Sequence, residues 1–147
     1  MKYSIDIVKL NKFGFRADGL FPKQLEKYYI FGEEVFSPCS GKVIDAVDGR
    51  EDYPPGIYMH DKKLAQPNYI IIERGSIRVR MSHFLKGSIK VKAGDTVKEG
   101  QLIGAVGDSG LSFEPHLHIQ VTENGHGVKF MLNSKYLKRN DLIKIHD

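Results

Sequence analysis

Glycine and proline repeatedly interrupt the apolar stretches of this sequence, and no other feature limits its fold as strongly. The stretches between them are only a few residues long, as in residues 93–104, where Gly94, Gly100 and Gly104 occupy turn positions. Stretches this short suit β-strands, whereas a globular helix usually runs to about ten residues or more. Their regular spacing predicts a compact all-β fold, an antiparallel sandwich or open barrel, rather than alternating βαβ units.

The individual segments support this β-rich class with little helix. Strands are expected at residues 3–8, twice within 32–44, and at 69–73, 76–82, 89–91, 105–106 and 117–121. A short helix is expected at residues 22–29, because Pro22 suits a first helical turn. A polar loop lies between Asp48 and Tyr69, and loops of this length often line a binding cleft. A passive surface excursion fits that loop equally well. The tail, residues 134–145, is expected to pack as a closing turn or strand.

Length and composition favour one soluble globular domain covering residues 1–147. Hydrophobic residues make up 41% and charged residues 27% of the chain, which is ordinary for a folded domain. No apolar run approaches the ~20 residues needed to cross a bilayer. No secretory signal is visible either. The net charge of +4 comes from lysines scattered along the chain. This distribution favours solvated strand edges over a nucleic-acid surface.

Two histidines separated by one residue form the most informative local pattern. His116 and His118 follow Pro115, which favours extended backbone in the residue before it. If both histidines lie in a strand, their side chains share one face while Leu117 faces the core. Imidazole is a good zinc ligand and the usual general base near neutral pH. By itself the pair is a weak signal, since core or surface histidines arise at this spacing by chance.

The surrounding motifs strengthen that interpretation. They are Gly-Asp-Ser-Gly at residues 107–110, Pro-His-Leu-His at 115–118, the glycine-containing run at 94–104, Ser-His-Phe-Leu at 82–85 and the Pro-x-x-Gly corner at 38–41. Together they resemble the lysostaphin/LytM-type zinc endopeptidases, which hydrolyse bacterial peptidoglycan. The resemblance extends over residues 3–121, and residues 107–118 are its most specific part. It implies a zinc-dependent metallopeptidase acting on peptidoglycan peptide, in an extracellular or cell-wall location.

The resemblance also implies a role for each of four residues. Asp6 and His118 correspond to zinc ligands, and His116 corresponds to the general base that takes a proton from the zinc-bound water. His83 corresponds to the histidine that orients that water or stabilises the developing oxyanion. Each residue also has a structural alternative: Asp6 in an ordinary ion pair, for example, or His83 at a strand edge beside water.

The sequence departs from the family pattern at two positions. Lys2 stands where the family has a third ligand, a histidine four residues before the aspartate, and an ammonium group repels a metal ion. Three explanations fit: a ligand further upstream, a degenerate site that binds cell-wall peptide or regulates a partner hydrolase without cleaving, or His60 supplied from the long loop. The second departure is Met81, where the family often has a tyrosine.

The sequence also resembles a second protein class in part. A lipoyl-, biotin- or phosphocarrier-type domain would share the short hairpins at residues 35–43 and 94–104, but the lysine setting at residues 98–100 does not match. The single cysteine, Cys39, excludes an internal disulfide and is interpreted as a small buried hydrophobic residue. His60, His126 and His146 have no motif around them and are expected at the surface.

Overall fold

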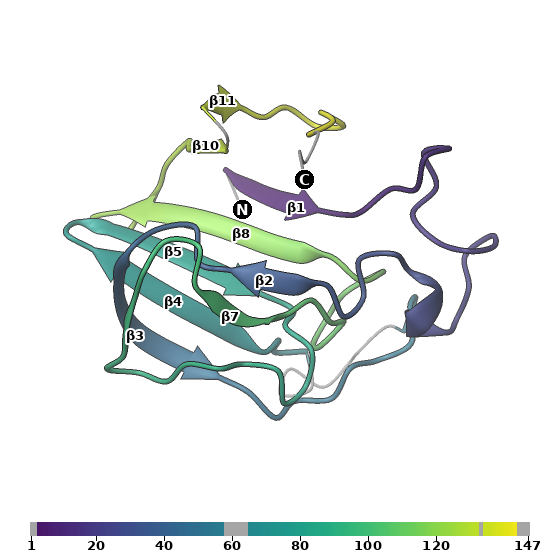
Figure 1. Cartoon of the computed structure of the whole chain (residues 1–147), viewed down its shortest axis with the longest axis horizontal. Helices are drawn as coiled ribbons and strands as arrows, with labels where there is room; N and C mark the ends of the chain where they lie inside the picture. Colours follow the sequence, from purple (N-terminus) through teal and green to yellow (C-terminus); the bar gives the residue numbers. More distant parts are fainter. Residues whose placement is uncertain (1–2, 58–64, 133, 144–147) are drawn as a thin grey trace.

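The computed structural model describes residues 3–57, 65–132 and 134–143, and these form a β-rich fold (Figure 1). The expected all-β class is confirmed. The sheets are antiparallel, and none closes into a barrel. The main sheet has the order β1-β8-β5-β4-β3-β6, with β9 paired to β8. Its strands are β1 (Ser4–Ile7), β3 (Gly41–Val47), β4 (Tyr69–Arg74), β5 (Ile77–Ser82), β6 (Thr96–Val97), β8 (Leu117–Glu123) and β9 (His126–Gly127).

Two small sheets complete the fold. The first pairs β2 (Glu34–Phe36) with β7 (Leu102–Ala105), and the second pairs β10 (Met131–Leu132) with β11 (Lys135–Tyr136). Figure 1 shows β2 and β7 crossing in front of the large sheet, and the core lies between these two layers. Its main side chains are Val35 and Ile103 from the small sheet with Val43, Ile70, Ile72, Val79, Met81, Leu117, Ile119 and Val121 from the large one.

The opposite face of the large sheet carries mostly polar side chains. Strand residues alternate between faces, so directly opposed residues of neighbouring strands share a face. Because β8 pairs with both β1 and β5, this open face combines side chains from several strands. They are Ser4 and Asp6 of β1, His118, Gln120 and Thr122 of β8, Arg78, Arg80 and Ser82 of β5, and Tyr69, Ile71 and Glu73 of β4.

Most expected strands are confirmed, and the exceptions have local causes. The helix expected at residues 22–29 is wrong beyond one 3-10 turn, η1 (Leu25–Lys27). Tyr28 and Ile30 are both buried, and burying alternate residues requires extended backbone. Residues 89–91 form no strand, although Ile89 and Val91 pack against the core. The tail contributes β11 as expected. No helix in the described ranges is long and apolar enough to cross a membrane.

The contact between β3 and β4 leaves no room for a side chain at Gly41. A Cβ atom there would lie 2.5 Å from the backbone oxygen of Glu73 and 2.8 Å from Cγ2 of Ile72. We expect Gly41→Ala to lower the free energy of unfolding by about 1 to 3 kcal/mol, because overpacking forces two backbone segments apart. Urea denaturation measures this, with Lys42→Ala on the same strand as control. Equal stability of the two variants would contradict the close approach.

Candidate metal centre

Strand pairing brings Asp6 and His118 together from opposite parts of the chain. They are directly opposed residues of the antiparallel pair β1–β8. His118 Nδ1 lies 2.6 Å from Asp6 Oδ1, on the open face of the sheet. This hydrogen bond is the main reason that the pKa of the Asp6 carboxyl is lowered, with desolvation acting against it. A carboxylate only accepts, so in this arrangement Nδ1 of His118 carries a proton.

His116 lies just before β8 and turns its ring toward the same pair. Its Nε2 atom is 3.7 Å from Asp6 Oδ1. Its other ring nitrogen, Nδ1, is 2.9 Å from the backbone oxygen of Glu114 and 3.1 Å from the Ser112 hydroxyl. A backbone carbonyl can only accept a hydrogen bond, so Nδ1 of His116 is the protonated nitrogen. In the neutral ring the lone pair is therefore on Nε2, the nitrogen that faces Asp6.

His83 lies beside His116 at the end of β5. Their ring centroids are 4.5 Å apart, and the ring of His118 lies 6.1 Å from that of His83. His83 Nδ1 donates to the backbone oxygen of Ser109 over 2.8 Å, which again leaves the lone pair on Nε2. Burial is the main cause that lowers the pKa of His83 to about 4, and nearby His116 adds to it. The ring is therefore neutral at physiological pH.

The backbone at His83 is held in an unusual conformation by neighbouring groups. Its φ of 69° lies in the left-handed region, which is costly for a residue with a side chain. The backbone oxygen of buried Asn68 accepts from the backbone nitrogens of His83 and Phe84 at 3.0 and 3.3 Å. The Ser109 hydroxyl bridges the chain by donating to the Phe84 oxygen and accepting from the Asn68 backbone nitrogen. These bonds fix the ring that projects from His83.

The three groups nearest the sheet edge have the chemistry of a metal site. One possible ligand atom from each of Asp6, His116 and His118 lies within 4.8 Å of the others. A carboxylate with imidazoles is a typical zinc donor set. The ring of His118 also has a buried Nε2 atom without a hydrogen-bond partner among the described residues. To bind an ion next to Asp6, His118 Nδ1 would give up the proton that it donates to the carboxylate, and Nε2 would carry the ring hydrogen instead. The residues thus fit a zinc ion.

All four residues singled out in the sequence therefore meet at one place, while other histidines do not. His126 is exposed in β9, as expected. Lys2, His60 and His146 lie outside the described residues. Met81 is 1% exposed and faces the core, so its side chain does not reach the open face. Cys39 packs against the core, and burial raises the pKa of its thiol, which agrees with a structural role.

The described part of the long loop packs beside this centre. Asp52 forms an isolated bridge with Ser109, and its carboxylate accepts from the backbone nitrogens of Asp108 and Lys86. On the other side, Arg16 forms an ion pair with Glu114 and so ties residues 11–21 to the histidine segment. These contacts hold the segment that carries the Gly-Asp-Ser-Gly motif.

Three buried polar residues of the site were not anticipated as functional. Asn68 is not part of any motif, and only its contacts with residues far along the chain show its importance. Ser109 and Asp108 lie inside the Gly-Asp-Ser-Gly motif, which was a signal, but the motif did not indicate which atoms they bind. Asp108 is 1% exposed, and its Oδ1 has no hydrogen-bond partner in the described part of the chain.

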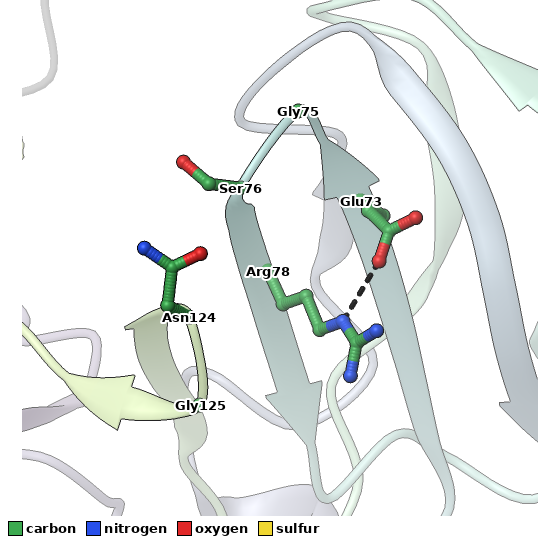
Figure 2. Close-up of a pocket in the computed structure, with 6 residues that line it drawn as sticks. All are labelled: Glu73, Gly75, Ser76, Arg78, Asn124 and Gly125. Carbon is green, nitrogen blue, oxygen red and sulfur yellow. Dashed lines mark hydrogen bonds and ion pairs between the residues drawn. The ribbon is translucent and has the colours of Figure 1, made fainter.

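A separate hollow lies at the opposite end of the large sheet. It has a volume of about 260 Å³ and adjoins the β4–β5 turn (Figure 2). Its lining residues are Glu73, Gly75, Ser76, Arg78, Asn124 and Gly125. None of these lining residues is a histidine or a cysteine. The histidine centre is therefore the better candidate for a zinc site than this hollow.

Comparison with protein families gives a match over most of the chain. The family model described as Peptidase family M23 matches residues 28–130. The matched range includes His83, His116 and His118 and begins after Asp6. Among solved structures, the chain is similar to a zinc containing peptidase from Vibrio cholerae, with 31% identity and a TM-score of 0.51. That match covers 67% of this chain and 26% of the Vibrio protein.

Matches to two further structures cover a larger share of the other protein's chain. The catalytic domain of a variant of the prophage-encoded M23 protein EnpA from Enterococcus faecalis is 19% identical, with a TM-score of 0.50, over 87% of this chain and 89% of that domain. It supports the fold. The catalytic domain of the antimicrobial peptidase lysostaphin from Staphylococcus simulans is 28% identical, with a TM-score of 0.48, over 74% of this chain and 77% of that domain.

Asn68 supports the His83 segment through its side chain as well as its backbone. Its amide donates to the backbone oxygens of Arg50 and Phe84 and accepts from the Arg50 nitrogen. We expect Asn68→Ala to lower the free energy of unfolding by about 2 to 4 kcal/mol, because it leaves buried backbone groups without partners. Chemical denaturation measures the loss, with the exposed amide variant Gln24→Ala as control. A loss no larger than that of the control would contradict this role.

Asp108 makes stability depend on pH. Burial is the main cause that raises its pKa to about 6; the Ser112 hydroxyl acts against this, and the carboxylates of Asp52 and Glu114 add to it. The folded state therefore holds this proton more tightly than the unfolded state, and the stabilisation is lost as pH rises through about 6. We expect Asp108→Asn to be more stable than the wild type at pH 8 by about 2 to 3 kcal/mol and nearly equal to it near pH 4.

Urea denaturation of the wild type and the Asp108→Asn variant across this pH range provides the measurement. Asp18→Asn, at an exposed position, serves as control and should show no such divergence. A difference between Asp108→Asn and the wild type that stays constant with pH would contradict the titration of Asp108.

Proposed function

Because the chain belongs to peptidase family M23, we propose that it is a zinc-dependent endopeptidase that hydrolyses peptide bonds of bacterial cell-wall peptidoglycan. The observation that carries the proposal is the opposition of Asp6 and His118 in the β1–β8 register, with His116 3.7 Å from the same carboxylate oxygen. The peptidoglycan substrate follows from the motifs at residues 82–85 and 107–118, which resemble lysostaphin/LytM-type enzymes. That substrate implies an extracellular or cell-wall location.

Asp6 and His118 would hold the ion in this proposal. Their side chains meet on the open face of the sheet, where the Asp6 carboxylate is exposed to solvent. A zinc ion bound there would lower the pKa of a coordinated water toward ~7 and polarise the scissile carbonyl. His118 is held in place by its strand, because β8 is hydrogen-bonded to β1 on one side and to β5 on the other.

His116 and His83 would handle the proton and the water. The lone pair on His116 Nε2 faces Asp6 and suits a general base that accepts a proton from the attacking water. His83 Nε2 is also an acceptor, because its Nδ1–H is committed to the Ser109 carbonyl. A neutral ring in this tautomer can orient water by accepting its hydrogen, but it cannot donate to an oxyanion. The geometry therefore favours the water-orienting role for His83.

The second candidate function is a catalytically silent relative that binds cell-wall peptide or regulates a partner hydrolase. The number of ligands supports this second function. If His116 is the general base, the described residues supply only two zinc ligands, whereas a catalytic zinc ion usually has three protein ligands. If His116 instead serves as the third ligand, the base would have to be another group. Metal content and activity of single variants separate these arrangements.

We expect the purified chain, prepared without chelators, to hold about one zinc ion and to release new amino groups from purified peptidoglycan. His118→Ala should lose the metal and the activity together. His116→Ala should keep the metal but lose about 10²- to 10⁴-fold in kcat, because only proton transfer is removed. Elemental analysis and amine-release kinetics measure these outcomes.

His126→Ala is the matched control, because it removes an exposed imidazole from β9 without touching the centre. Loss of zinc in His116→Ala would assign that residue as a ligand. Metal-free wild-type protein that still binds peptidoglycan would contradict the enzyme and support the silent relative.

A further inference from the structure

Arg80 on β5 holds its guanidinium group in one fixed position on the open face. Its Cζ atom lies 4.2 Å from the centre of the Tyr69 ring, and its Nε donates to the Ser82 hydroxyl over 3.2 Å. Tyr69 is in turn fixed, because its hydroxyl donates to Asp45 over 2.7 Å. An arginine stacked on an aromatic ring loses little further freedom when it binds a ligand.

The register places both contact partners of Arg80, Tyr69 and Ser82, in line with His118. Tyr69 opposes Ser82 across β4–β5, and Ser82 opposes His118 across β5–β8. Tyr69, Ser82 and His118 therefore form one row across three strands, which are about 4.8 Å apart. Because the Arg80 Nε contacts Ser82 and its Cζ stacks on Tyr69, the guanidinium group lies over β5 and β4 beside this row, between one and two strands from His118. An extended peptide crossing the open face at the metal centre would pass it.

Arg80 has no ion pair with any residue that the structure describes. Arg78, two residues earlier on the same face, differs: its Nε lies 2.8 Å from Glu73 Oε2, as Figure 2 shows. Arg80 is also less exposed than Arg78. It therefore keeps the N–H groups of its two terminal nitrogens available beside the site.

We propose that Arg80, stacked on Tyr69, binds a carboxylate of the substrate peptide and so selects acidic peptides at the neighbouring metal centre. A guanidinium fork pairs with a carboxylate through two parallel hydrogen bonds, which a neutral amide cannot reproduce. This inference rests on the proposed peptidase function, because it names a chemical class for that substrate. The carboxylate can belong to an acidic side chain or to a peptide C-terminus.

The test uses three short probe peptides and no cleavage. They are acetyl-Ala-Gly-Gln-Ala-amide, which has no carboxylate, acetyl-Ala-Gly-Glu-Ala-amide, with one in a side chain, and acetyl-Ala-Gly-Gln-Ala with a free C-terminus. We expect the wild-type chain to bind at least one acidic peptide about tenfold more tightly than the neutral one, the size expected for a hydrogen bond to a charged group. The Arg80 Nε–H resonance should shift in the same titration. The stronger of the two acidic peptides identifies the source of the carboxylate.

Variants assign the preference to one residue. Arg80→Gln should abolish the tenfold preference, and Arg80→Lys, which keeps the charge without the fork, should retain only part of it. Arg78→Gln is the matched control and should bind like the wild type. Equal affinity of the wild type for all three peptides would overturn the proposal even if Arg80→Gln failed to fold. A preference that persists in Arg80→Gln would also overturn it.

Failure of the proposed peptidase function and failure of the carboxylate site give different experimental results. A chain without zinc or hydrolysis that still prefers acidic peptides through Arg80 would refute the enzyme and leave the carboxylate site intact. A chain that cleaves peptidoglycan but binds acidic and neutral peptides equally would refute the carboxylate site alone. In an active enzyme, Arg80→Gln should raise KM for the acidic peptide substrate and leave kcat nearly unchanged.

Discussion

The pairing register of β1 with β8 is the constraint on which the candidate centre depends. Asp6 and His118 are opposed residues, and their hydrogen bond exists only because both side chains leave the sheet on the same face. A slip of one residue would turn Asp6 toward the core and bring an apolar isoleucine to the open face. The same β8 strand is fixed on its other side by β5, so the position of His118 does not rest on β1 alone.

Backbone carbonyls determine the chemistry of the two other histidines. The carbonyls of Glu114 and Ser109 each accept from an Nδ1–H, which leaves an acceptor nitrogen on His116 and on His83. The tautomers thus follow from loop conformation and not from the titration of the rings. The left-handed backbone at His83 and its buried hydrogen bonds to Asn68 are part of the same arrangement, since they aim the ring. The tightly packed loops serve to orient imidazoles.

Local patterns predicted the strands and the histidine pair, because both depend on alternation over a few residues. His116 and His118 share a face for that reason, and the all-β class follows from short interrupted stretches. The helix expected at residues 22–29 was wrong, because burial of Tyr28 outweighed a local preference. Asn68 could not be identified from the sequence, since its side-chain partners lie 16 and 18 residues away. Asp6 was identified only through family resemblance, because one carboxylate in a strand has no distinctive local pattern.

The candidate metal ligand Asp6 lies on β1, which is the edge strand of the main sheet formed by the described residues. Edge strands detach locally at a lower free-energy cost than central ones. If β1 separates from β8, the carboxylate leaves while His116 and His118 stay in place. Ion affinity would then include the cost of docking this strand, and a bound ion would in turn hold the strand against the sheet. Any partner that engages β1 would thereby act on the occupancy of the centre.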